Sequence, residues 1–127
     1  MLFLNAGIGE PGAFADLSTV RLERIVNINV VHPTYIARVL LGQMLDRSQR
    51  SAIVVTSSGL GMAPVAGVSA YSASKAYVST LAQALSYEVE HKIDVVDWVA
   101  GETSTKMLRV KNNSRTVTPE VSVRGML

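Results

Sequence analysis

The chain has 127 residues, of which 48% are hydrophobic and 17% are charged. This length suits one domain, and the composition is apolar enough for that domain to fold. The net charge of +2 is too small to indicate a nucleic-acid-binding protein. The absence of cysteine excludes disulfides and thiolate metal sites, and the two isolated histidines, His32 and His91, predict no metal centre. No apolar run approaches the roughly 20 residues that span a bilayer.

Three short apolar runs are predicted to be strands. Residues 2–4 end at Asn5-Ala6-Gly7, and residues 93–99 lead into Ala100-Gly101. Residues 52–55 form a continuous apolar run, which is typical of a strand that is covered on both faces in a parallel sheet.

Two long segments between these strands have the patterning of helices. The first begins at Ser18 or Thr19, both suitable N-caps, and runs to about Leu45. The segment His32-Pro33 should kink or restart this helix, because proline lacks a backbone donor. The second helix is predicted over residues 69–91. The apolar stripe of the first helix is too wide for one buried face, which indicates contact with a sheet and with a partner.

The remaining segments are predicted to be loops, with one short helix near the end. Residues 8–15 and 59–68 are rich in glycine and proline and are expected to be loops. Thr118-Pro119-Glu120 resembles a helix start, with proline at the first helical position.

The alternation of strands and helices predicts an α/β fold with a parallel sheet and right-handed crossovers. Residues 5–7, 57–59 and 101–105 each follow the carboxyl end of a predicted strand. Parallel strands end at the same rim of their sheet, and ligands bind there. The polar and glycine-rich segments are therefore expected to meet at one functional rim.

Tyr71 and Lys75 are four residues apart at the start of the second helix, so their side chains share one face. A nearby ammonium favours the phenolate, which suits a phenol that acts as a general acid or base. The spacing alone is weak evidence. By itself, Lys75 could be a solvated lysine on the helix surface.

Two other polar residues are candidates for the same site. Ser58 lies at a strand end thirteen residues before Tyr71, although alone it could simply cap the following loop. Asn29 lies inside the first helix, where asparagine is a poor helix former. It could serve the site, or it could mark the restart of the helix before His32-Pro33.

Together these motifs resemble the short-chain dehydrogenase/reductase family. The resemblance covers most of residues 1–107 and rests on four segments: Asn5-Ala6-Gly7, Ile28-Asn29-Val30, Ser57-Ser58, and Tyr71-Ser72-Ala73-Ser74-Lys75. In addition, residues 100–107 stand where the family usually has Pro-Gly-x-Val-x-Thr-x-Met. Ser57-Ser58-Gly59 and residues 104–107 are most similar to the hydroxysteroid dehydrogenase and 3-oxoacyl-CoA reductase group.

The resemblance implies a partial Rossmann-like, doubly wound parallel sheet that contains the central strands and helices only. Residues 1–127 would form a single partial NAD(P)-binding domain. The implied function is an oxidoreductase that uses NADP(H) or NAD(H) to interconvert a carbonyl and an alcohol. The implied substrate is a small, lipid-like molecule, either a steroid or a 3-oxoacyl compound.

The resemblance also implies a role for each site residue. Tyr71 would donate the proton to the carbonyl, and Ser58 would hydrogen-bond the carbonyl oxygen. Lys75 would bind the nicotinamide ribose and favour the ionised form of Tyr71. Asn29 would hold a water that links Lys75 to a proton relay. The cofactor would contact the following residues: Asn5, Ala6, Gly7, Tyr71, Lys75, Gly101, Thr103 and Thr105.

The sequence departs from the family pattern in one large and two small ways. Family members normally begin with a strand and a Gly-rich turn that cradles the pyrophosphate, and these 127 residues contain no such turn, so the domain is expected to lack its amino-terminal Gly-rich half. Ala100 replaces the family proline, and Thr103 replaces a valine. The alternative is therefore a non-catalytic remnant of the family that acts as an interaction module.

The expected partners are a small-molecule substrate and a second copy of the chain, with no nucleic acid and no membrane segment. The homodimer would form through the two long helices. The outer face of the second helix is predicted to be Ala70, Ala73, Tyr77, Thr80 and Ala84. Basic residues also gather over residues 106–115, either as a solvated segment or as a mouth that attracts anionic groups.

Overall fold

A computed structural model describes residues 1–101, 103 and 116–124. The predictions made for Thr105 and for the basic residues of segment 106–115 lie outside the described residues.

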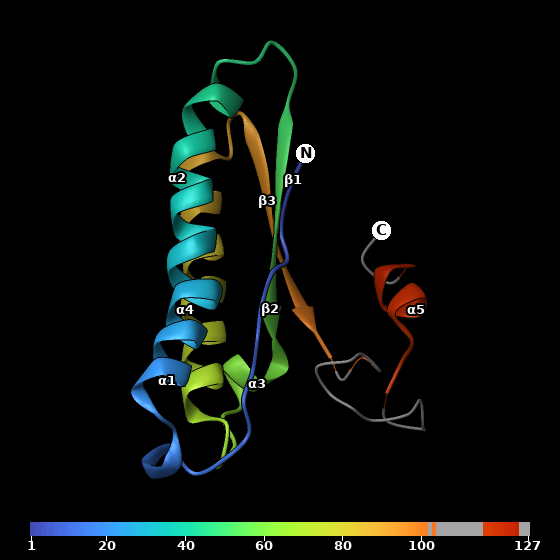
Figure 1. Ribbon diagram of the computed structural model, residues 1–127. Helices are drawn as coiled ribbons and strands as arrows, with labels where there is room; N and C mark the ends of the chain where they lie inside the picture. Colours follow the sequence, from blue (N-terminus) through green and yellow to red (C-terminus); the bar gives the residue numbers. More distant parts are fainter. Residues whose placement is uncertain (102, 104–115, 125–127) are drawn as a thin grey trace.

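The centre of the fold is a three-stranded parallel sheet in the order β1-β2-β3 (Figure 1). β1 spans Leu2–Leu4, β2 spans Ser51–Ser58 and β3 spans Ile93–Ala100. The predicted parallel α/β architecture is confirmed. β2 is longer than the predicted residues 52–55, because its polar end, residues 56–58, pairs with residues 98–100 of β3.

The first long helical segment is divided into three parts. α1 spans Thr19–Val26 and begins at Ser18, whose hydroxyl oxygen accepts a hydrogen bond from the amide of Arg21. A π-helical segment, η2, spans Asn27–Val31, and α2 spans His32–Leu45. The predicted interruption is confirmed: Pro33 lies in the first turn of α2, directly after the π-helical segment, and the backbone stays helical across the junction.

The second long helix, α4, spans Ser69–Val89 and ends two residues before the predicted end at residue 91. One short helix was not predicted: α3, Gly59–Met62, lies in a segment expected to be a loop. A 3-10 turn, η1, spans Phe14–Asp16 in the loop before α1. α5 spans Pro119–Arg124 and begins at the predicted position. No helix in the described ranges is long and apolar enough to cross a membrane.

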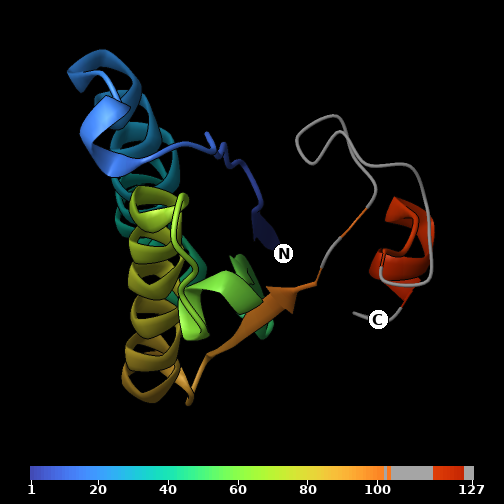
Figure 2. The same cartoon turned by 90° about the horizontal axis from the view of Figure 1, so that it is seen from below.

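α2 and α4 lie side by side on one side of the sheet, as Figures 1 and 2 show. The buried core lies between this helical layer and the strands, and it consists of Leu4, Ala37, Met44, Ile53, Val55, Val78, Ala82, Val89 and Ile93. The opposite face of the sheet is apolar as well, but Phe3 is 51% exposed and Val96 is 44% exposed. The sheet is thus covered on one face by the described helices.

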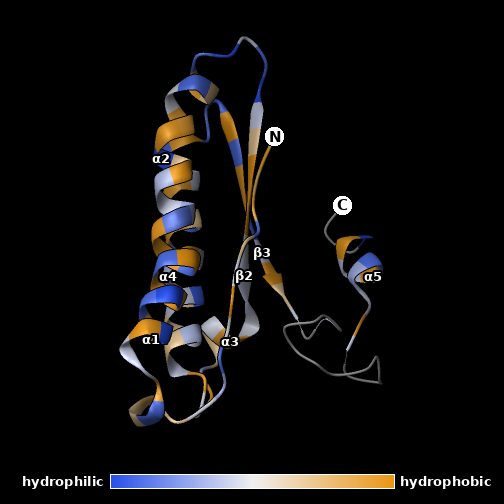
Figure 3. Cartoon of the chain, viewed as in Figure 1, coloured by the Kyte–Doolittle hydropathy of each residue, from blue (hydrophilic) through white to orange (hydrophobic). Residues whose placement is uncertain are grey.

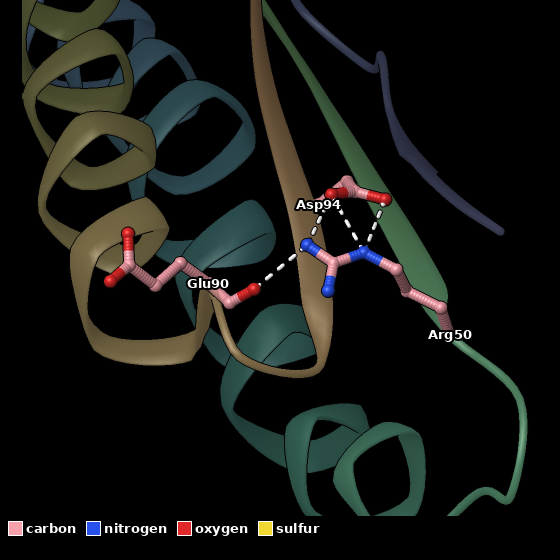
Figure 4. A network of polar contacts seen from close by, with 3 residues as sticks. All are labelled: Arg50, Glu90 and Asp94. Carbon is pink, nitrogen blue, oxygen red and sulfur yellow. Dashed lines mark hydrogen bonds and ion pairs between the residues drawn. The ribbon is translucent and has the colours of Figure 1, made fainter.

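Polar contacts of Arg50 join the amino-terminal ends of β2 and β3 (Figure 4). These contacts, between Arg50, Glu90 and Asp94, are called the Arg50 clamp below. The Arg50 guanidinium donates through Nε and Nη2 to the Asp94 carboxylate at 2.6–3.0 Å and through Nη2 to the Glu90 carbonyl at 2.7 Å. Hydrogen bonding by Arg50 holds the pKa of the Asp94 carboxyl below its usual value. The clamp fixes the loop before β2 to the end of α4 and to β3.

Candidate active site

The Lys75 side chain is buried beneath the rim formed by the carboxyl ends of the strands. Only 4% of the residue is exposed, and Nζ donates a hydrogen bond to the backbone carbonyl of Thr56 at 2.8 Å. Burial lowers the pKa of Lys75, and the negative charge of Asp97 partly opposes this effect. The alternative that Lys75 is a solvated surface lysine is therefore wrong.

The loop after β1 lies directly against Tyr71 and Lys75. A Cβ atom at Gly7 would lie 3.1 Å from Lys75 Nζ, and one at Gly9 would lie 3.0 Å from Tyr71 Cδ2. Lys75 Nζ is 5.9 Å from the centre of the Tyr71 ring. The backbone can approach both side chains this closely because the two glycines have no side chain. Gly9 was not among the predicted site residues, although its place in a glycine-rich loop after a strand was a signal.

The buried Asn29 side chain fastens this loop to α4. Its Oδ1 accepts a hydrogen bond from the Ile8 amide at 2.8 Å, and its Nδ2 donates to the Ile8 carbonyl at 2.8 Å and to Ser74 Oγ at 2.9 Å. Ser74 Oγ in turn donates to the Tyr71 carbonyl at 2.7 Å. Both Nδ2 hydrogens are thus used, and Oδ1 keeps one free lone pair. These hydrogen bonds place Asn29 beside the turn of α4 that carries Tyr71 and Lys75. The sequence did not predict them.

Ser58 ends β2 and caps α3, since its Oγ accepts a hydrogen bond from the Leu60 amide at 3.3 Å. The capping role considered for this serine is therefore confirmed. Accepting this bond uses one lone pair of the hydroxyl and leaves its O–H free to donate. Capping and donation to a substrate oxygen are compatible.

The other described residues that were predicted to contact the cofactor follow the ends of β1 and β3. Asn5 and Ala6 are exposed, and Asn5 Oδ1 accepts a hydrogen bond from Thr56 Oγ1 at 2.8 Å. Gly101 is also exposed. The Thr103 hydroxyl lies 3.3 Å from the Gly101 carbonyl and 3.3 Å from Ser122 Oγ of α5.

Gly61 allows α3 to lie against the helix that carries Tyr71 and Lys75. A Cβ at Gly61 would lie 2.8 Å from the Ala76 amide nitrogen and 2.9 Å from the Lys75 carbonyl carbon. We expect Gly61→Ala to lower the free energy of unfolding in urea by about 1–3 kcal/mol, because two backbones must move apart. Gly59→Ala is the matched control, since a Cβ there meets nothing within 4 Å. Equal stabilities for the two variants would contradict this interpretation.

Comparisons with known proteins agree with this geometry. The short chain dehydrogenase family matches residues 1–116. Inactive hydroxysteroid dehydrogenase-like protein 1 of Homo sapiens is 38% identical over 82 residues, which are 65% of this chain and 24% of that protein. Very-long-chain 3-oxoacyl-CoA reductase of Anas platyrhynchos is 32% identical over 133 residues, which are 100% of this chain and 42% of that protein.

Among solved structures, 4-hydroxyisoleucine dehydrogenase complexed with NADH superimposes with a TM-score of 0.77 at 25% identity, covering 84% of this chain and 48% of that one. The chain spans less than half the length of these curated relatives. Its parallel sheet, its buried lysine and its match to the family over residues 1–116 lead to one conclusion. The chain belongs to the short-chain dehydrogenase family.

Proposed function

We propose that this chain is the catalytic part of an NAD(P)(H)-dependent oxidoreductase that interconverts a carbonyl and an alcohol. The observation that carries the proposal is the position of Lys75. The residue is 4% exposed, and its ammonium lies against Gly7 and 5.9 Å from the centre of the Tyr71 ring, at the rim where parallel α/β sheets bind ligands. A buried charge of this kind at a rim favours a functional site over a structural one.

In the proposed reduction, each side chain has one task. The Tyr71 hydroxyl donates a proton to the carbonyl oxygen, and the free O–H of Ser58 donates a hydrogen bond to the same atom. The Lys75 ammonium stabilises the phenolate that forms when Tyr71 gives up its proton. It also contacts the nicotinamide ribose. Asn29 holds the loop and α4 together, and the free lone pair of its Oδ1 or its backbone carbonyl would hold the relay water.

The residues at the rim fit the nicotinamide half of NADP(H) or NAD(H), which supplies the hydride when it is bound. The contacts we propose are Asn5, Ala6, Gly7, Tyr71, Lys75, Gly101, Thr103 and Thr105. The loop over Lys75 has no side chain at Gly7, so a ribose could reach the ammonium. A Gly-rich turn for the pyrophosphate does not occur in these 127 residues, which would make the chain a partial NAD(P)-binding domain.

For the substrate, we propose a lipid-like carbonyl compound, either a 3-oxoacyl thioester or a keto-steroid. This choice is supported by relatives named very-long-chain 3-oxoacyl-CoA reductase and 3-ketodihydrosphingosine reductase, the second 36% identical over 90 residues in Bos taurus. Oxidation of NADPH in the presence of a 3-oxoacyl-CoA is the assay that tests the class of substrate.

The second candidate function is a non-catalytic interaction module. A relative named inactive hydroxysteroid dehydrogenase-like protein 1 favours it. An enzyme should bind NADPH once the missing cradle is supplied, whereas an interaction module should not. The two candidates are therefore separated by joining the chain to the amino-terminal strand and Gly-rich turn of an active relative.

We expect the 127-residue chain alone to bind NADPH more weakly than about 10 μM, which corresponds to roughly −7 kcal/mol. The pyrophosphate is negatively charged, and the family binds it with a Gly-rich turn at a helix N-terminus. Titration with NADPH, followed by nucleotide fluorescence, measures the affinity. Saturable binding at or below that concentration would show that the cradle contributes less than we propose.

We further propose that two copies pair through α2 and α4. Tyr35 and Val39 of α2 are 68% and 67% exposed, and Thr34 Oγ1 lies 3.2 Å from Tyr77 Oη on the neighbouring helix α4. Of the outer-face residues predicted for α4, Ala70 is half-buried and the rest are exposed. Hydrophobic stretches recur along α2 in Figure 3, coloured orange.

We expect a dimer by light scattering at micromolar concentration and a monomer for Val39→Asp. Burying an aspartate in an apolar contact is unfavourable, so the substitution should separate the copies. Val121→Asp on α5 is the control, because it makes the same change on another exposed valine. A monomeric parent chain would refute this proposal.

A further inference from the structure

Asp97 stands at a position where the strand pattern favours an apolar residue. Side chains alternate between the two faces of a strand, and Ile93 and Val95 on the same face of β3 as Asp97 belong to the core or pack against it. Asp97 pairs in the sheet with the buried Val55. A carboxylate at the edge of an apolar core is unfavourable unless it is hydrogen-bonded or paired with a positive charge. This position therefore calls for a compensating group.

Hydrogen bonds satisfy only one of the two carboxylate oxygens. Ser79 Oγ on α4 donates a short hydrogen bond to Asp97 Oδ2, and Gln83 Nε2 donates to Ser79 Oγ at 3.1 Å. Asp97 Oδ1 is buried and has no hydrogen-bond partner among the residues that the structure describes. The carboxylate is thus fixed against α4, and no lysine, arginine or histidine within residues 1–101, 103 and 116–124 forms an ion pair with it.

Lys75, the buried cation among the residues that the structure describes, lies on the same face of α4 as Ser79. Lys75 precedes Ser79 by four residues, which is one helical turn, and its Nζ reaches the carbonyl of Thr56, the residue after Val55. Lys75 and Asp97 therefore face one helix–sheet interface from opposite sides. Burial lowers the pKa of Lys75, and the charge of Asp97 raises it.

Other titratable groups around Lys75 do not provide this charge. Those on α1 and α2 are all exposed: Arg21, Glu23, Arg24, His32, Tyr35 and Arg38. β1, β2, η2 and α3 carry no titratable side chain, and Asp94 on β3 is exposed and paired with Arg50. Glu10, in the loop after β1, forms an ion pair with Arg21 at 3.2 Å, and the Tyr71 ring is uncharged when protonated.

We propose that Asp97 is a positioning residue for the active site: its carboxylate, fixed by Ser79, is the buried counter-charge that keeps Lys75 an ammonium ion. This inference rests on the proposed function, in which the ammonium binds ribose and stabilises the Tyr71 phenolate. Lys75 is useful in that reaction only while it is charged, and burial alone would favour its neutral form. Asp97 would extend the pH range in which the site works.

The test is Asp97→Asn, which keeps an oxygen for Ser79 and removes the charge. In the purified chain, NMR of the lysine ε-carbons should show Lys75 losing its proton at lower pH than in the parent. In the reductase assay, the alkaline limb of kcat should move in the same direction with KM for the carbonyl substrate unchanged. An exposed carboxylate on α4 provides the control: Glu88→Gln makes the same charge change and should leave Lys75 unaffected.

A second variant covers the case in which Asp97→Asn does not fold. Asp97→Ser removes the same charge, keeps an oxygen that can accept a hydrogen bond from Ser79, and should also make Lys75 lose its proton at lower pH than in the parent. An unchanged Lys75 titration in whichever of the two variants folds would overturn the proposal. If the Lys75 titration shifts in a protein without reductase activity, the coupling stands and the proposed function fails.

Discussion

Tyr71→Phe is expected to lower the rate of carbonyl reduction by a factor of about 10²–10⁴, the usual contribution of a general acid. The substitution removes only the phenolic hydroxyl. The ring that lies against Gly9 remains, and so do the hydrogen bonds of the first turn of α4, which involve the Tyr71 carbonyl and Ser74. Cofactor binding should therefore be largely unchanged. The measurement is NADPH oxidation in a version of the protein that binds the cofactor.

Tyr77→Phe is the matched control for this substitution. Tyr77 lies on the same helix, is 42% exposed, and its hydroxyl contacts Thr34 of α2 rather than the rim. We expect this variant to keep the activity of the parent. A Tyr71→Phe variant whose rate stays within about threefold of the parent would refute the role of Tyr71, since a general acid contributes far more.

Lys75→Met is expected to cost as much activity as Tyr71→Phe and also to change how stability depends on pH. Methionine has a similar length and shape but cannot contact ribose or stabilise a phenolate. Groups that act as one unit are not additive, so the double variant should be no slower than the slower single variant. Rates that multiply in the double variant would show that Tyr71 and Lys75 act independently.

The pH effect follows from the lowered pKa of Lys75 in the folded chain. Between that value and the ordinary value of 10.5, the unfolded chain binds more protons at this lysine than the folded chain does. Stability that comes from Lys75 therefore rises with pH across this window. Urea unfolding at neutral and alkaline pH should show the parent gaining stability relative to Lys75→Met as the pH increases. A difference that is constant or falls with pH would contradict the burial of a charged lysine.

The sequence predicted the order of the strands and helices because their signals are local. Apolar runs marked the three strands, and a hydroxyl N-cap marked the start of α1 at Ser18. The Tyr71 and Lys75 spacing fixed their shared face, since four residues make about one helical turn. The family was also correctly predicted, because its motifs are short segments that can be read without the fold.

What the sequence did not predict depends on contacts between distant residues. Asn29 forms hydrogen bonds with Ile8, which lies 21 residues away in the sequence. The residues around Asn29 therefore could not indicate that it connects the loop to α4. α3 was predicted as loop because Gly59 and Gly61 are poor helix formers. It forms because Ser58 caps it and because it packs closely against α4. Asp97 did carry a signal, a charged residue in an otherwise apolar strand, and that signal was not used.

The Arg50 clamp has a consequence for the opposite end of the sheet. Neighbouring strand residues point to opposite faces, so sliding β3 along β2 by one residue would exchange those faces. Asp97 would then turn away from α4, and Trp98 would turn toward it. Arg50 opposes this slip because its guanidinium donates hydrogen bonds to both Asp94 and the Glu90 carbonyl. These bonds lie next to Ser51 and Ile93, the first paired residues of β2 and β3. An exposed ion pair at the far end of the sheet thus helps to select the strand alignment in which Asp97 faces α4.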